Sequence, residues 1–218
     1  MNQDFPAESL AGNIRNGLRQ LGIPPEDRLV KHFLAYLQLL AEWNKAYNLT
    51  AIRDYPHMIS HHLFDSLSVL PWIHGRECLD IGTGAGLPGM ILAMAEPHRH
   101  WTLLDSNRKK IRFVNQVRLE LGIDNVEIVC ERVEAFRPAR PPCTIICRAY
   151  ASLDRIIKQA GHLLLPETRL LAMKGANCSN EVQALDMDAL AVQIHTFTVP
   201  GIDEQRSLVE IRALPSPR

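Results

Sequence analysis

Four glycines lie within the segment Asp80–Gly89, which reads Asp-Ile-Gly-Thr-Gly-Ala-Gly-Leu-Pro-Gly. Glycine lets the backbone approach a ligand closely, and a helix that follows such a loop offers free N–H groups at its first turn. Asp105 lies 23 residues after Gly82, a spacing at which an acid accepts hydrogen bonds from ribose hydroxyls. Together these features predict a nucleoside-containing ligand. The alternatives are a tight structural turn for the loop and a helix cap for Asp105.

The glycine loop can be aligned in two frames, which predict different cofactors. Gly84-x-Gly86-x-x-Gly89 matches the dinucleotide fingerprint. Gly82-x-Gly84-x-Gly86, with Asp80 two residues ahead, is typical of the S-adenosylmethionine loop of Rossmann-like methyltransferases. The second frame is favoured because glycine begins directly at the expected strand end, where an acid would repel a pyrophosphate. An NAD-dependent oxidoreductase stays open as an alternative, although the chain has no Tyr-x-x-x-Lys pair to serve in hydride transfer.

Strand-like and helix-like segments alternate through the last two thirds of the chain. The pattern predicts strands over 77–82, 100–104, 126–130, 143–147, 169–173, 193–199 and 207–213. It predicts helices over 88–95, 109–121, 153–164 and 180–190. Such alternation implies a mostly parallel sheet with right-handed crossovers, and the last two strands, joined by a turn at Pro200-Gly201, an antiparallel edge hairpin. The expected fold is therefore α/β, a Rossmann-like class I S-adenosylmethionine-dependent methyltransferase fold with seven strands.

The first seventy residues are expected to be helical. Apolar side chains recur three or four residues apart from Leu29 to Tyr47 and share one helical face. Shorter helices are expected over 8–21 and over 58–70, the latter ending at Pro71. We therefore expect an N-terminal helical extension over 1–72 and a Rossmann-like domain over 73–218.

The charges balance over the whole chain but not along it. With 24 basic and 24 acidic side chains the net charge is zero, which excludes a histone-like arm or a wholly basic RNA-coating protein. Residues 108–155 nevertheless carry ten basic and six acidic side chains. Arg108, Lys109, Lys110 and Arg112 begin this stretch and are candidates for contact with an RNA backbone, the alternative being a solvated helix face. Two further phosphate candidates are Lys174 and Arg206, at the ends of later strands.

Three features of the sequence indicate where in the cell the protein is located. The longest apolar stretch contains Pro88 and Gly89 and is too short for a membrane span, and the amino terminus lacks the layout of a signal peptide. Five cysteines, an odd number without Cys-x-x-Cys spacing, favour reduced thiols. We expect a cytoplasmic protein without membrane contact, and nothing demands more than a monomer.

The segment Trp43–Thr50, which reads Trp-Asn-Lys-Ala-Tyr-Asn-Leu-Thr, is followed by His62-x-x-Asp65-Ser66. This pair of motifs resembles the amino-terminal signature of the bacterial ribosomal small-subunit methyltransferase G family, also called glucose-inhibited division protein B. Later segments match the family pattern in order, over about residues 26 to 212: the glycine loop, Leu103–Ser106, Arg132–Glu134, Arg148-Ala149 with Leu153, and Lys174-Gly175. The resemblance implies methyl transfer from S-adenosylmethionine to N7 of one guanine in 16S ribosomal RNA, in a loop near the decoding site.

The resemblance also implies a set of cofactor-binding residues: Gly82, Gly84, Leu87, Asp105, Val133, Glu134 and Arg148. Val133 and Glu134 would border the adenine. Arg148 would face the methyl-transfer point and contact the cofactor carboxylate or an RNA phosphate. His61 stands where the family usually has Arg, and Cys147 where it usually has Ser, which weakens any role for those two side chains.

The expected chemistry needs few catalytic groups. Guanine N7 carries an in-plane lone pair and no proton, so attack on a sulfonium methyl group needs orientation but no general base. We assign no catalytic residue, and interpret Cys147 as a core thiol because cytosine-C5 methyltransferases have Pro-Cys or Thr-Cys there. His57 and His61 have the i, i+4 spacing of metal ligands but no third ligand, so no metal is expected. The remaining alternative is a non-enzymatic RNA-binding assembly factor with a vestigial cofactor pocket.

Overall fold

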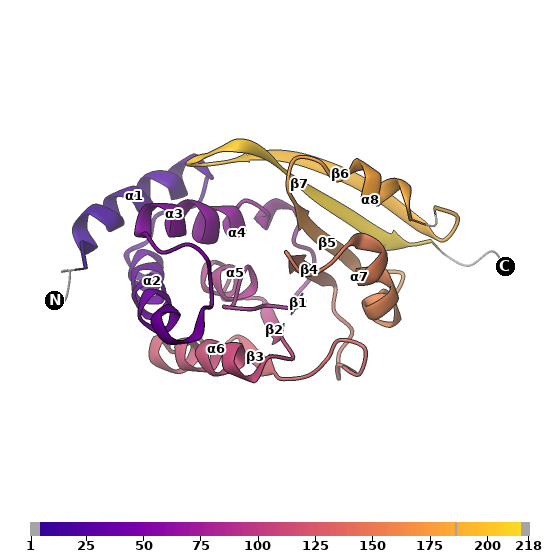
Figure 1. The fold of residues 1–218 in the computed structure, drawn as a ribbon, viewed down its shortest axis with the longest axis horizontal. Coiled ribbons are helices and arrows are strands. Elements are labelled where there is room, and N and C mark those ends of the chain that lie inside the picture. The colour runs from indigo at the N-terminus through magenta and orange to yellow at the C-terminus, as the bar shows by residue number, and fades with distance from the viewer. Residues whose placement is uncertain (1–4, 186, 215–218) are drawn as a thin grey trace.

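The computed structural model describes residues 5–185 and 187–214 and builds seven strands into one sheet (Figure 1). The strands are β1 (Glu77–Ile81), β2 (His100–Leu104), β3 (Val126–Val129), β4 (Thr144–Arg148), β5 (Arg169–Lys174), β6 (Leu190–Val199) and β7 (Ile202–Ala213). Their order is β3-β2-β1-β4-β5-β7-β6, with β1 to β5 parallel and β7 antiparallel to both neighbours. The predicted fold class is confirmed. The carboxyl ends of the five parallel strands meet at one edge, where α/β sheets bind ligands.

Helices cover both faces of the sheet (Figure 1). The helical elements are α1 (Ala7–Gln20), α2 (Asp27–Tyr47), α3 (Tyr55–Met58), the π-helical turn η1 (Ile59–Phe64), α4 (Asp65–Leu67), η2 (Leu70–Trp72), α5 (Gly89–Ala95), α6 (Arg108–Leu121), α7 (Leu153–Ala160), η3 (Gly161–Leu163) and α8 (Ser179–Gln183). Alternate residues of β5 show the two layers: Leu171 and Met173 join the core under α5 and α6, while Leu170 and Ala172 join the core under α7.

The N-terminal helices share a hydrophobic core with one face of the sheet. Ile14, Phe33 and Leu37 are fully buried in the cluster that also contains Trp101 of β2. α2 reaches the glycine loop directly, because the buried hydroxyl of Tyr36 donates to the Ala85 carbonyl at 2.9 Å. This contact makes the shape of the loop depend on a helix outside the sheet.

Several predicted boundaries were wrong: the strand expected from 193 begins at Leu190, and the helix expected over 153–164 ends at Ala160, followed by a 3-10 turn. The helix expected over 58–70 is an α–π–α segment, and the one expected over 180–190 ends at Gln183. β7 begins at Ile202 rather than 207, because the polar stretch after the turn continues the hairpin with β6. Within the described part of the chain, no helix is both long and apolar enough to cross a membrane.

Candidate functional site

The glycine loop is held in shape by Asp80, the fourth residue of β1. Its Oδ2 accepts hydrogen bonds from the Thr83 hydroxyl at 2.6 Å and from the Gly89 backbone N–H at 2.9 Å. Burial raises the pKa of this carboxyl group to about 6, although the two hydrogen bonds oppose the rise. Asp80 therefore closes the loop on itself, and the other side of the loop is left for a ligand.

The loop glycines adopt a backbone that other residues rarely accept. Gly82 and Gly84 have φ of +70° and +59°. A Cβ on Gly82 would lie 2.2 Å from the ring of Tyr150, so a side chain there would displace that ring. Glycine is therefore required at this position by both conformation and space.

Asp105 connects the end of β2 to the loop. Its Oδ2 accepts from the Gly84 N–H at 2.9 Å, and its Oδ1 accepts from the Asn107 N–H at 2.8 Å. Asn107 is the residue that caps α6, since its side chain accepts from the N–H groups of Lys109 and Lys110. Asp105 keeps further lone pairs, with which it can accept from ligand hydroxyls.

A cavity of about 330 Å³ lies beside these residues, and we call it the glycine-loop cavity. It is lined by Gly82, Leu104, Asp105, Ser106, Lys110, Glu131, Arg132, Val133, Glu134, Ala149, Tyr150, Ala151, Arg155 and Gln159. Four of the predicted cofactor residues are among them. The lining combines a glycine turn that a Cβ would fill, an acid at the second strand end, and three carboxylates balanced by three cations. That donor set fits the hydroxyls, amino group and carboxylate of S-adenosylmethionine.

Two side chains that the motifs did not reveal form part of the cavity wall. The hydroxyl of Tyr150 donates to Oε1 of Gln159 at 3.1 Å, and the Gln159 amide donates to Oε1 of Glu134 at 2.7 Å. This chain of hydrogen bonds joins α7 to the loop after β3. Neither Tyr150 nor Gln159 belongs to a recognisable pattern, so only their position in the fold identifies them.

Arg148 lines a different cavity. This second cavity, of about 400 Å³, we call the arginine cavity; it is lined by Ile52, His61, His62, Asp65, Arg148, Ala149, Met173, Lys174, Gly175, Phe197, Arg206 and Ser207. Arg148 donates from one Nη atom to the His61 carbonyl at 2.6 Å and to Asp65 at 3.0 Å. Ala149, with a left-handed φ of +50°, lines both cavities and separates them.

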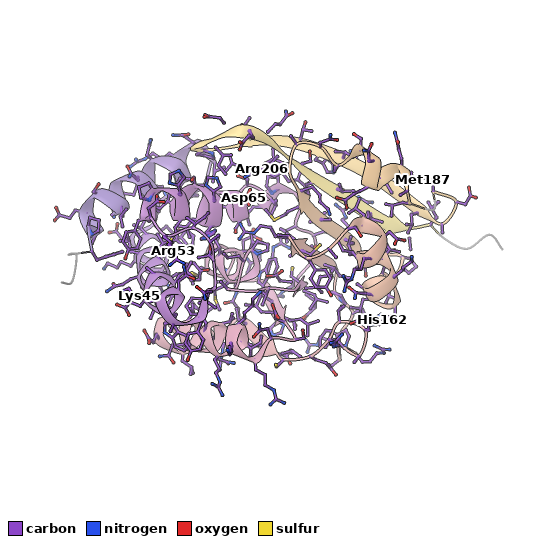
Figure 2. All side chains as sticks on the ribbon, in the orientation of Figure 1. Lys45, Arg53, Asp65, His162, Met187 and Arg206 are labelled. Carbon is purple, nitrogen blue, oxygen red and sulfur yellow. The ribbon has the colours of Figure 1, made fainter. Side chains whose placement is uncertain are left out.

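Two predicted phosphate contacts lie in the arginine cavity and are already paired. Arg206 donates to Asp65 at 3.3 Å, and Figure 2 shows these two side chains next to each other, from β7 and α4. Lys174 donates to the Ala151 carbonyl and to Glu181, both at 2.8 Å. The cavity thus holds three cations, each fixed by at least one carboxylate.

The basic start of α6 divides into two parts. Arg108, Lys109 and Arg112 are exposed and form no ion pair with the acidic side chains that the structure describes. Lys110 instead lines the glycine-loop cavity, with its Nζ close to Gly84. The structure therefore separates Lys110 from the other three predicted RNA contacts.

Three residues singled out in the sequence, Leu87, Cys147 and His62, are buried. Leu87 is buried and lines neither of the two cavities. Burial raises the pKa of the Cys147 thiol to about 12, which disfavours a nucleophilic thiolate. Burial and the nearby Arg148 lower the pKa of His62 to about 4, so its imidazole is neutral at pH 7; its Nε2 lies 2.9 Å from Oγ1 of Thr50.

Residues 29–209 match the family described as rRNA small subunit methyltransferase G. The chain belongs to this family. It is 49% identical over 208 residues to a ribosomal RNA small subunit methyltransferase G from Stutzerimonas stutzeri, covering 94% of this chain and 97% of the relative. It is 47% identical over 206 residues to one from Nitrosococcus oceani, with coverage of 94% and 96%.

Solved structures support the fold alone. The chain is similar to a SAM dependent methyltransferase from Aquifex aeolicus, with a TM-score of 0.56, 18% identity and coverage of 78% and 97%. It is also similar to a cofactor-bound protein from MTB, with a TM-score of 0.60, 16% identity and coverage of 82% and 90%. Membership of the family confirms the predicted ribosomal RNA methyltransferase rather than the NAD-dependent oxidoreductase.

Proposed function

We propose that this enzyme methylates N7 of one guanine in 16S ribosomal RNA, near the decoding site. The observation that carries the proposal is the pair of cavities at the carboxyl edge of the sheet. One is lined as a nucleoside-binding site and the other by cations, and they meet at Ala149. A methyl donor in the first and a base in the second would be adjacent at that residue.

The residues of the glycine-loop cavity would hold the cofactor. Asp105 would accept from the ribose hydroxyls, Val133 and Glu134 would border the adenine, and Gly82 and Gly84 would let the backbone approach the rest of the molecule. When bound, S-adenosylmethionine supplies an electrophilic methyl group on a sulfonium. Asp80 and Tyr36 act on the loop, because Oδ2 of Asp80 and the Tyr36 hydroxyl form hydrogen bonds to it.

The arginine cavity suits a base that must be positioned but not deprotonated. Guanine N7 has a lone pair and no proton, so no proton acceptor is needed at the methyl-transfer point. The pKa of His62 is lowered to about 4, so its imidazole is a weak proton acceptor, and the Cys147 thiol, with its pKa raised to about 12, is buried outside this cavity. Arg148, fixed by Asp65 and the His61 carbonyl, has a defined direction from which to hold the base or its phosphate.

The partner would be 16S ribosomal RNA or the small ribosomal subunit, bound in the cytoplasm by a monomeric enzyme. The exposed cations of α6, Arg108, Lys109 and Arg112, would contact RNA phosphates. Lys174 and Arg206 would contribute within the arginine cavity, and Lys110 at the border of the cofactor site.

Two measurements test this function. Calorimetry should show binding of S-adenosylmethionine and none of a nicotinamide dinucleotide. Primer extension on 16S RNA, after chemical cleavage at N7-methylated guanines, should stop at one guanine in cells that carry the gene and not in cells that lack it. An identical stop pattern in both strains would refute the proposed reaction. It would not bear on the cofactor, which the calorimetry tests separately.

A further inference from the structure

A ladder of aromatic rings runs from the core to the surface at the end of α2. Phe113 of α6 is fully buried, and its ring centroid lies 5.7 Å from that of Trp43. Tyr47 stacks on Trp43 with centroids 5.2 Å apart and an interplanar angle of 26°. Tyr47 is 37% exposed, so the ladder presents a ring to solvent on a rigid support. None of the groups assigned to the reaction uses this feature.

The loop that follows Tyr47 is fixed in place and leads to the arginine cavity. The buried amide of Asn44 donates to the Thr50 carbonyl and accepts from the Thr50 N–H, both at 2.9 Å. Asn48 ends α2 in the left-handed conformation, which turns the chain. Two residues after Thr50, Ile52 lines the arginine cavity. The exposed ring and the cavity are therefore connected by a short, well-held segment.

Two exposed cations lie near this ring along the chain: Lys45 two residues before Tyr47 and Arg53 six residues after it. Lys45 and Arg53 are both exposed, and neither forms an ion pair with an acidic side chain of the described residues. In the view of Figure 2, Lys45, Arg53, Asp65 and Arg206 succeed one another from the end of α2 toward β7. On the other side, α2 packs on α6, which begins with the exposed basic residues described above.

We infer that Lys45, Tyr47 and Arg53 form a docking platform for single-stranded RNA beside the target base. A base of a flanking nucleotide stacks on Tyr47, and Lys45 and Arg53 contact the phosphates on either side. An exposed aromatic ring together with nearby cations is the combination with which proteins bind single strands, because every base has a face that can stack. The inference rests on the proposed RNA substrate and adds the surface by which the strand reaches the arginine cavity.

The platform can be tested in the full-length enzyme with two variants and a matched control. Tyr47→Ala removes the ring, and K45A/R53A removes the two charges. The control R28A/K31A removes two exposed cations, without an ion pair among the described residues, from the first turns of the same helix, fourteen or more residues before Lys45. Binding is measured by fluorescence anisotropy of a labelled single-stranded RNA of mixed sequence over a series of KCl concentrations.

Tyr47→Ala should weaken RNA binding about 5- to 150-fold, the range for loss of one stacking ring, and Tyr47→Phe should restore it. K45A/R53A should lower the slope of log affinity against log salt by about 1.4, because each phosphate contact to a single strand contributes about 0.7. The control should keep both affinity and slope, and all variants should bind S-adenosylmethionine like the wild type.

Two outcomes would overturn the platform. One is unchanged RNA affinity and salt slope in Tyr47→Ala and K45A/R53A. The other is normal binding to naked RNA with activity lost only on ribosomal particles, which would assign the surface to a protein partner. If the wild-type enzyme itself methylates no RNA, the proposed function fails instead, so the two failures are distinguishable.

Discussion

Replacing Asp80 by Asn should remove a pH-dependent penalty on stability that the glycine loop carries. Asp80 is fully buried, its Oδ1 has no hydrogen-bond partner among the described residues, and its pKa is raised to about 6 from an ordinary value of 3.8. The folded state therefore binds the Asp80 proton more tightly than the unfolded state does. Stability is then highest when both states are protonated, and it falls as the pH rises from about 3.8 to about 6.

The size of this effect follows from the two pKa values. The difference between about 6 and 3.8 corresponds to about 3 kcal/mol of unfolding free energy, at about 1.4 kcal/mol per pH unit. Asn cannot titrate, and its amide oxygen can still accept from Thr83 and Gly89. As the pH rises from about 4 to 7, the wild type should therefore lose about 3 kcal/mol of unfolding free energy that Asp80→Asn keeps.

Urea unfolding of the cofactor-free proteins, followed by circular dichroism from about pH 4 to 8, measures this difference. Asp54→Asn is the matched control with the opposite sign. Hydrogen bonds from the backbone N–H and ring of His57 lower the pKa of Asp54, so that group adds stability above its ordinary pKa and loses it as the pH falls. Because Asp54 is exposed, its effect should be small. A wild-type-minus-Asp80→Asn difference that stays constant with pH would show that Asp80 is not desolvated.

Three further variants test the geometry of the site. Gly82→Ala should abolish S-adenosylmethionine binding in calorimetry, because its Cβ would lie 2.2 Å from Tyr150, whereas Gly12→Ala, with no atom within 4 Å, should leave it unchanged. Asp65→Asn should destabilise the fold by about 1.5–3 kcal/mol, since it leaves two partly buried arginines short of their anion, and should lower the methylation rate while cofactor affinity persists. Tyr36→Phe should cost about 1–3 kcal/mol in thermal or urea unfolding, because the loop carbonyl it serves stays buried without a donor; stability equal to the wild type would exclude a structural role for that bond.

The sequence predicts the parallel sheet and the glycine loop because both have local signals. Alternating strands and helices impose right-handed crossovers, and those bring Gly82, Asp105 and the segment at Val133 to one edge without any knowledge of packing. That topology brings the Gly84 N–H within 2.9 Å of Oδ2 of Asp105, to which it donates a hydrogen bond. What the sequence could not place were groups whose role depends on the rotation of an element. Gln159 reaches the cavity only because one side of α7 faces it.

The π-helical turn shows a different limit. All residues from Met58 to Val69 except His61 are buried. Because the segment has no exposed polar face, its sequence pattern cannot show the extra residue that a π turn inserts into an α-helix. Within this turn the His61 carbonyl accepts from Arg148, and Asp65 follows directly. The resemblance implied that Arg148 contacts the cofactor carboxylate or an RNA phosphate. In the structure its guanidinium donates to these two acceptors, which belong to residues that line the arginine cavity.

The charges of the arginine cavity are consistent with the proposed product as well as with the substrate. Methylation at N7 places a positive charge on the base, and a site of three unpaired cations would resist that charge. Here Asp65 serves both Arg148 and Arg206, and Glu181 serves Lys174, so two carboxylates accompany the three cations. The small positive excess attracts a phosphate, while the carboxylates moderate repulsion of the methylated base. Strong RNA attraction is then assigned to exposed cations outside the cavity, where it cannot oppose methyl transfer.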